Sequence, residues 1–297
     1  MLRRAALSSL LVAALTHHQH GVLAQPYAGC TTSSYYDDPG LVASWRASSG
    51  AALRAMLRTH LVARHFVIPY SSHTRVDVWD ALEVLDATPG DPENVTLVYS
   101  LRSVPKGQHV DASGWNREHV WPKSYGVGYT GPDFTDVHHL RAVDWNVNSA
   151  RNNKYFGNCD EAAAGSTCTS PAHREAAPST ADSSDEFRPP TTQRGDVARA
   201  MFYMAARYDG TETNTENLSL SDCPCQYTWT MGKLGDLLTW HTADPVDDVE
   251  RARTEGVCTG YQGSRNPFVD YPDLVALVGL ANQGLVHLSS DEVGVEE

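Results

Sequence analysis

Hydrophobic and polar residues follow two periods along the chain, and these predict a mixture of helices and strands. Apolar side chains recur every three or four residues in residues 51–61, where Leu53, Met56 and Leu57 share a face with His60. In residues 94–101 they alternate with polar ones, as in a half-buried strand. The predicted helices are residues 51–61, 76–85, 144–155, 196–208, 234–240 and 244–257, and the predicted strands are residues 94–101, 115–121 and 137–143.

The order of these elements predicts one mixed α+β domain. No internal repeat divides the chain, and its 297 residues are enough to bury a sizeable core. The stretch 162–184 is rich in small and polar residues and is predicted to be a surface excursion. The last helix is predicted to begin with Asp244 as its N-cap and Pro245 in its first turn.

The first 24 residues have the pattern of a secretory signal. Arg3 and Arg4 precede an apolar stretch, and Val22-Leu23-Ala24 has the pattern of a small-residue cleavage site. The apolar stretch is too short to span a bilayer, which requires roughly 20 residues. We therefore expect a soluble protein that is exported, to the extracellular space or the periplasm, and has no membrane partner after cleavage.

All six cysteines follow the signal, and an exported chain can keep them as disulfides. We expect a Cys159–Cys168 bridge, because the residues between them form a loop with little else to order it. Cys223 and Cys225 are too close in sequence for a comfortable internal bridge, so we expect each to pair elsewhere, one of them with Cys258. Zinc is disfavoured because paired C-x-x-C spacings are absent.

The net charge of −13 argues against a general basic surface that would hold nucleic acid. Loss of Arg3 and Arg4 with the signal would make it −15. Residues 101–157 depart from this acidity, with seven Lys and Arg against five Asp and Glu. A polyanion site, if present, is expected in this block.

The same block contains the residue types needed for phosphodiester hydrolysis. Glu118 and Asn148 offer oxygen ligands for a divalent ion, and His119 can accept a proton near neutral pH. The block also supplies cations in Arg117, Arg141, Arg151 and Lys154, and a guanidinium can hold a non-bridging phosphate oxygen. A neutral His119 is required for activity, which we therefore expect to fall below the histidine pKa of roughly 6.5.

Each of these residues also has a structural interpretation. In regular strands, Glu118 and His119 would point to opposite faces, as would His138 and His139, unless the first strand breaks near Pro122. His138 is expected to be a core histidine. We expect Arg141 and Lys154 to be solvated charges. The tryptophans are expected to lie in the core or in the wall of the site rather than to stack on bases: Trp115, Trp121 and Trp145.

Four ordered blocks resemble the endonuclease I family of secreted and periplasmic nucleases. They are NREHVWPKSYG, DVHHLRAVDWNVNSARNNKYFG, RGDVARAMFYMAARYDG and YQGSRNPFVDYP, and they span about Tyr70 to Asp273. The resemblance implies a ββα-metal (His-Me finger) motif with surrounding helices. It also implies cleavage of DNA, and often of RNA, with little sequence preference and with 5′-phosphate products.

By this resemblance Glu118 and Asn148 would bind Mg²⁺, with Mn²⁺ or Ca²⁺ as substitutes, and His119 would be the general base. Arg117 or Arg151 would be the phosphate clamp, and spacing does not choose between them. His139 stands where many relatives carry Asn. A disulfide-bearing insertion of some relatives, with any arginine that it carries, is absent.

The expected organisation is therefore a signal peptide, an N-terminal extension with a helix, a catalytic domain and an acidic tail, in a protein that we expect to be monomeric. The boundaries are residues 1–24, 25–69, 70–276 and 277–297. Two alternatives from other classes are an inactive, secreted nucleic-acid-binding module with this fold and a structural zinc protein. Loss of Glu118, His119 or Asn148 would indicate the inactive module, but all three are present.

Overall fold

The computed structural model describes residues 29–109 and 113–279, so the predicted signal and most of the acidic tail lie outside the described residues. The helices are α1 (Thr32–Tyr35), α2 (Leu41–Arg46), α3 (Gly50–Val62), α4 (Val78–Leu85), α5 (Trp145–Arg151), α6 (Arg194–Arg207), α7 (Leu234–Ala243), α8 (Asp248–Gly256), α9 (Pro267–Asp270) and α10 (Leu274–Leu277). The remaining helical segments are the 3-10 turns η1 (Lys123–Tyr125), η2 (Asp133–Thr135), η3 (Thr191–Gln193) and η4 (Gln226–Thr228), and the π-helix η5 (Val257–Gln262). The strands are β1 (Ala87–Thr88), β2 (Asp91–Thr96), β3 (Ser103–Pro105), β4 (Trp115–His119), β5 (Leu140–Asp144), β6 (Tyr155–Phe156), β7 (Ala181–Asp182), β8 (Glu186–Arg188), β9 (Ser219–Leu220) and β10 (Thr230–Met231).

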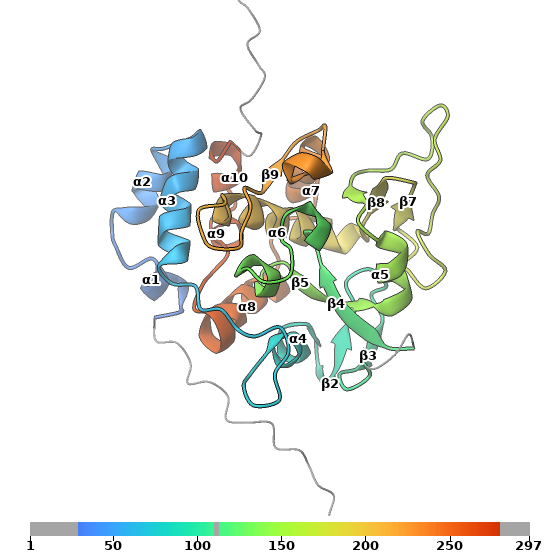
Figure 1. The fold of residues 1–297 in the computed structure, drawn as a ribbon, viewed down its shortest axis with the longest axis horizontal. Coiled ribbons are helices and arrows are strands. Elements are labelled where there is room, and N and C mark those ends of the chain that lie inside the picture. The colour runs from blue at the N-terminus through green and yellow to red at the C-terminus, as the bar shows by residue number, and fades with distance from the viewer. Residues whose placement is uncertain (1–28, 110–112, 280–297) are drawn as a thin grey trace, which may run out of the picture.

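Helix α6 is the centre of the larger hydrophobic core. It packs against α3, α7 and α9, and nearly all of its side chains are buried. The N-terminal helices α2 and α3 lie on one side of it, while β4, β5 and α5 lie on the other (Figure 1). Arg199 of α6 is buried and donates from Nε to the Glu250 carboxylate of α8 at 2.7 Å, so two helices are joined by a desolvated ion pair.

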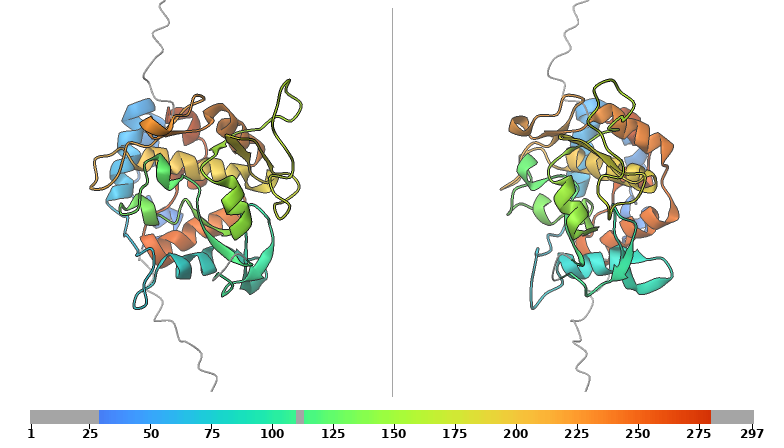
Figure 2. Two further views of the ribbon diagram at one scale, coloured as in Figure 1. Left: turned by 45° about the vertical axis from the view of Figure 1, so that its right-hand side comes forward. Right: turned by 90° about the vertical axis from the view of Figure 1, so that its right-hand side faces the viewer.

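A second, smaller hydrophobic core is formed around α4. Side chains of α4, β2, β5 and η5 form this cluster, and it includes Trp115 of β4. The antiparallel sheet β1-β2-β3 belongs to the same end of the molecule, which remains the lower end in both rotated views (Figure 2). The two strands of the candidate site therefore lie between two cores.

Strands β4 and β5 pair antiparallel, with Trp115 opposite Asp144 and His119 opposite Leu140. The chain passes directly from β5 into α5, which packs back against both strands. Asp144 caps the helix by accepting hydrogen bonds from the backbone N–H groups of Asn146 at 2.9 Å and Val147 at 3.1 Å. This short connection fixes α5 beside the two strands.

Two disulfides are formed. Cys159–Cys168 confirms the prediction, whereas Cys258 pairs with Cys30 rather than with Cys223 or Cys225, so that prediction is wrong. The Cys30 bridge ties the segment before α1 to η5, and Cys30 itself belongs to the larger core. In the described part of the chain, Cys223 and Cys225 are not in a disulfide.

Several predicted boundaries are corrected. The strand expected at 94–101 ends at Thr96, and the strand expected to start at Val137 starts at Leu140, because residues 137–139 form a turn. The helix expected to reach Tyr155 ends at Arg151, since Asn152 has a φ of +52°. The last of the predicted helices begins after Asp247, which accepts a hydrogen bond from Glu250 N at 2.8 Å, rather than after Asp244.

Across residues 29–109 and 113–279, none of the helices has the length and apolar character required to cross a membrane. Helix, small sheets and irregular segments are mixed along one chain, as expected for the α+β class.

Candidate active site

A cleft of about 460 Å³ opens between β4, α5 and the loop before α4. All five residues that the sequence singled out line it. Its described lining is Tyr70, Trp79, Asn116, Arg117, Glu118, His119, Pro122, Lys123, Trp145, Asn148, Ser149, Arg151, Asn152 and Asn153.

Glu118 is a buried carboxylate, only 2% exposed, at the base of this cleft. Its Oε1 accepts a hydrogen bond from the Tyr99 hydroxyl at 2.8 Å and lies 3.1 Å from Nη1 of Arg151. Burial raises the pKa of the carboxyl, and Arg151, Tyr99 and Lys123 act in the opposite direction. Neither of the two contacts uses Oε2.

His119 is the last residue of β4, and its ring is held in one orientation. Nε2 lies 3.0 Å from the Phe134 carbonyl oxygen, and the Phe134 ring stacks on the imidazole at a centroid distance of 5.2 Å. Because a carbonyl only accepts, Nε2 carries the proton and Nδ1 is the basic nitrogen of the neutral ring. Burial, followed by the neighbouring His139, lowers the pKa of His119 well below its ordinary value. The imidazole is therefore neutral at pH 7 and remains so at lower pH than the sequence-based expectation assumes.

Asn148 projects from α5 towards β4. Its Nδ2 donates to Oδ1 of Asn116 at 2.8 Å, so the amide oxygen of Asn148 is left as an acceptor. In the described part of the chain, no group of three or more His, Cys, Asp and Glu side chains is suited to a metal ion. A metal in the cleft would depend on Glu118, Asn148 and water. Such a donor set fits Mg²⁺, which keeps several waters and takes few protein oxygens.

The two candidate arginines have different environments. Arg151 is 1% exposed and donates to the carbonyl oxygens of His119 at 3.2 Å and Val120 at 2.9 Å, besides its contact with Glu118. Arg117 lies with its guanidinium 3.4 Å from the Tyr70 ring centroid and 4.0 Å from that of Trp79. Its Nη1 donates to Tyr70 O and to Ser71 Oγ, which leaves Nη2 free of these contacts.

The structural interpretations of the other residues have mixed outcomes. His138 is buried, with Nε2 3.1 Å from the Ser264 carbonyl, as expected of a core histidine. Arg141 is buried and Lys154 pairs with Asp182, so neither is the solvated charge that was predicted. Trp115 and Trp121 are fully buried, whereas Trp145 is 37% exposed in the cleft wall.

Sequence reasoning missed several contributors to the site, among them Tyr70 and Trp79, which hold Arg117, and Tyr99, Phe134, Asn116 and Lys123. Tyr99, between β2 and β3, contacts Glu118, and Phe134, in η2, contacts His119; no local pattern marks either residue. Asn116 and Lys123 flank the Glu118–His119 pair in sequence, and alternation along β4 could have placed Asn116 on the face of Glu118.

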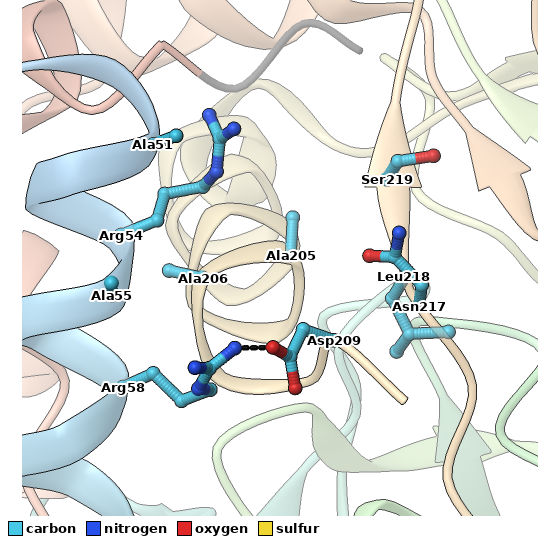
Figure 3. Close-up of a pocket in the computed structure, with 10 residues that line it drawn as sticks. All are labelled: Ala51, Arg54, Ala55, Arg58, Ala205, Ala206, Asp209, Asn217, Leu218 and Ser219. Atoms are coloured by element: carbon cyan, nitrogen blue, oxygen red, sulfur yellow. Dashed lines mark ion pairs between the residues drawn. The ribbon is translucent and has the colours of Figure 1, made fainter. Parts of the chain in front are cut away.

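A second cavity of about 230 Å³ lies between α3 and α6 (Figure 3). Arg58 extends from α3 and forms an ion pair with Asp209, and Arg54 donates to the carbonyl oxygen of Val278 at 3.0 Å. The described residues that line it include no histidine, cysteine or glutamate. Its arginines already have partners within the protein, so among the described residues this cavity has no counterpart of the His119, Glu118 and Asn148 set that lines the cleft.

Comparison with known proteins gives one consistent result. The model of the family described as Endonuclease I matches residues 51–273. The extracellular ribonuclease of Bacillus amyloliquefaciens is 38% identical over 245 residues, which cover 82% of this chain and 76% of that protein. The extracellular ribonuclease of Bacillus subtilis (strain 168) is 38% identical over 253 residues, covering 84% of this chain and 79% of that protein.

Proposed function

Because the chain belongs to the endonuclease I family, we propose that it is an exported, metal-dependent endonuclease that hydrolyses phosphodiester bonds in RNA and DNA. One observation carries this proposal: a single cleft contains the oriented base His119, the carboxylate of Glu118 and the amide oxygen of Asn148. The pairing of β4 with β5 and the packing of α5 on both supports a ββα-metal motif.

His119 is the proposed general base. Its Nδ1 accepts a proton from a water molecule, and the oxygen of that water attacks phosphorus while the 3′-oxygen leaves. The Phe134 carbonyl holds the Nε2 proton in place, so the ring enters the reaction with the correct tautomer. Proton transfer to the leaving oxygen comes from solvent in the open cleft.

Glu118 and Asn148 are the proposed Mg²⁺ ligands, and Mn²⁺ or Ca²⁺ could substitute. The ion, when bound, would stabilise the negative charge that develops on the phosphoryl oxygens. Tyr99 and Arg151 both contact Oε1 of Glu118, which fixes the carboxylate and points its second oxygen away from these partners. Asn116 does the same for the amide of Asn148.

Arg117 is the proposed phosphate clamp. Tyr70 and Trp79 hold its guanidinium at the cleft, and its Nη2 is available for a phosphate oxygen. Arg151 is instead a positioning residue, since its Nη1 and Nη2 are directed to the main chain of His119 and Val120 and to Glu118.

Hydrolysis by an activated water does not need the ribose 2′-hydroxyl, so the same site can act on both nucleic acids. Two relatives are named as extracellular ribonucleases, which supports RNA as a substrate and export as the destination. The products are expected to carry 5′-phosphate ends and no 2′,3′-cyclic phosphate.

The test is cleavage of single-stranded RNA and of supercoiled plasmid in Mg²⁺ and in EDTA, with analysis of the product ends. We expect cutting of both in Mg²⁺ and none in EDTA. Glu118→Gln, which keeps the shape of the side chain but removes the charge, should lose several kcal/mol of transition-state stabilisation, or at least about a hundredfold in kcat/KM.

Cyclic phosphate ends on RNA, or full activity in EDTA, would contradict this mechanism. Binding without cleavage of either substrate by the folded protein would favour the inactive binding module.

A further inference from the structure

Tyr129 is a large, exposed aromatic residue next to Lys123, which lines the cleft. It is 69% exposed and lies in the loop that joins η1 to η2. Gly126 begins this loop with a φ of +102°, and a Cβ there would come within 2.8 Å of Leu218. The backbone turn that presents Tyr129 is thus one that a larger residue would not adopt.

A series of rings joins Tyr129 to the proposed base. Its ring centroid is 5.9 Å from that of Phe134, whose ring in turn stacks on His119. Tyr129 is therefore the second ring outward from the imidazole. Since the reacting phosphate must lie beside His119, Tyr129 is close to where a neighbouring nucleotide would be placed.

Lys123 supplies the charge beside Tyr129. It lines the cleft with Glu118 and His119, and its Nζ lies 4.8 Å from the Tyr129 ring centroid. Among the described residues, no carboxylate oxygen lies within 4.0 Å of this ammonium group. By contrast, Arg151 is buried against main-chain carbonyls, so Lys123 is the cation better placed for a phosphate outside the reaction centre.

We propose that Tyr129 and Lys123 form a subsite for a nucleotide next to the scissile phosphate of a single-stranded substrate. The base stacks on the exposed surface of the Tyr129 ring, and its phosphate pairs with Lys123. A base can reach the ring only when it is not stacked within a duplex, so the subsite favours single strands. This inference rests on the proposed function, because it uses His119 to locate the reacting phosphate.

The experiment measures binding rather than turnover. A fluorescently labelled, single-stranded oligodeoxynucleotide is titrated with His119→Ala protein in Mg²⁺ over a series of NaCl concentrations, and its anisotropy gives Kd. The added substitutions are Tyr129→Ala, Tyr129→Phe and Lys123→Gln. Two controls lie outside the cleft lining: Tyr227→Ala, at a tyrosine that is 91% exposed, and Arg251→Gln on α8.

Loss of the ring in Tyr129→Ala should raise Kd between about fivefold and about a hundredfold, the effect of removing one stacked base. Tyr129→Phe keeps the ring and should bind within about twofold of the parent. Lys123→Gln should reduce the slope of log Kd against log salt by about 0.7, the value for one phosphate contact on a single strand, while Tyr129→Ala leaves that slope unchanged. A duplex of the same sequence should show little effect of Tyr129→Ala.

Unchanged Kd in folded Tyr129→Ala, or equal losses on duplex and single strand, would overturn the subsite. An unchanged salt slope in Lys123→Gln would overturn the phosphate contact. Cleavage by the wild-type protein, measured in parallel, separates the two proposals: binding that depends on Tyr129 without cleavage contradicts the nuclease and retains the subsite. A parent that binds no oligonucleotide contradicts the subsite, whereas cleavage by the wild-type protein in the same experiment would still support the nuclease.

Discussion

Some residues of the site are proposed to act on the substrate, and others hold those residues in position. Arg151 belongs to the second group. From the last turn of α5, its guanidinium contacts the carbonyl oxygens of His119 and Val120, at the end of β4, and the carboxylate of Glu118. It is fully buried, so these contacts replace water that the charge has lost. A phosphate ligand would need the opposite arrangement, with free donors directed into the cleft.

Arg151→Met should therefore reduce stability as well as activity. The buried Glu118 carboxylate and the carbonyl oxygens of His119 and Val120 would each lose a hydrogen-bond donor. This loss should lower the free energy of unfolding by about 3–5 kcal/mol. Urea unfolding of this variant measures the loss, and Arg251→Met on the exposed face of α8 is the matched control, expected to change stability by less than about 0.5 kcal/mol. A variant of wild-type stability with a large loss of kcat would show that Arg151 is a clamp after all.

At this scale, residue type identified candidates whose roles stay predictions. Arg117, Glu118, His119, Asn148 and Arg151 were singled out because base, ligand and cation types cluster in one block, and the structure places all five along one cleft. Residue type did not identify Tyr99 or Phe134. These act through a hydroxyl and a backbone carbonyl whose positions depend on tertiary contacts, so residue type gives no signal.

At the scale of elements, α5 is the piece that must be placed correctly, since it carries Asn148 and Arg151. It has only seven residues, too few to be stable alone, so its cap and its packing determine its position. Asp144→Ala removes the acceptor for Asn146 N and Val147 N and should cost about 0.5–2 kcal/mol of stability.

This variant should also lose activity, because a frayed α5 no longer presents the Asn148 oxygen. Thermal unfolding and a cleavage assay measure the two effects. Asp247→Ala, which removes the corresponding cap of α8, is the control: it should lower stability by a similar amount with a smaller effect on turnover. Equal losses of activity in both variants would argue against a specific role for the α5 cap.

Element types were predicted better than their ends, and the ends failed for local reasons. Alternation suggested a strand from Val137, but the Asp136 side chain accepts from His138 N at 2.9 Å and holds residues 137–139 in a turn. The helix pattern after Asp144 continued to Tyr155, but Asn152 adopts a left-handed φ and ends it. Hydrophobic period does not reveal either feature.

At the scale of the whole molecule, buried histidines connect the fold to pH. Burial lowers the pKa of His138 to about 3 and that of His139 to about 4. The negative charge of Asp136 raises both pKa values, but by less than burial lowers them. The unfolded chain binds protons at these residues near pH 6.5, whereas the folded chain does so only near pH 3–4. The free energy of unfolding therefore falls as the pH decreases from about 6.5 towards 3–4.

The free energy of unfolding should drop between pH 7 and pH 5, by up to about 1.4 kcal/mol per pH unit for each of these histidines. Urea unfolding at the two pH values measures it. His138→Gln, which retains a donor for the Ser264 carbonyl but does not titrate, should show a smaller drop than the wild type, and His73→Gln, at an exposed histidine, is the matched control. Equal stability at pH 5 and pH 7 would contradict this account.

The central claim is that neutral His119 acts as general base in a nuclease cleft, and His119→Ala tests it most directly. The measurement is kcat/KM for cleavage of a fluorogenic oligonucleotide in Mg²⁺, beside His173→Ala as a control for loss of an imidazole elsewhere. We predict a fall of about 10²–10⁴-fold for His119→Ala and no comparable change in the control. A folded His119→Ala protein that retained more than about a tenth of wild-type kcat/KM would contradict the account.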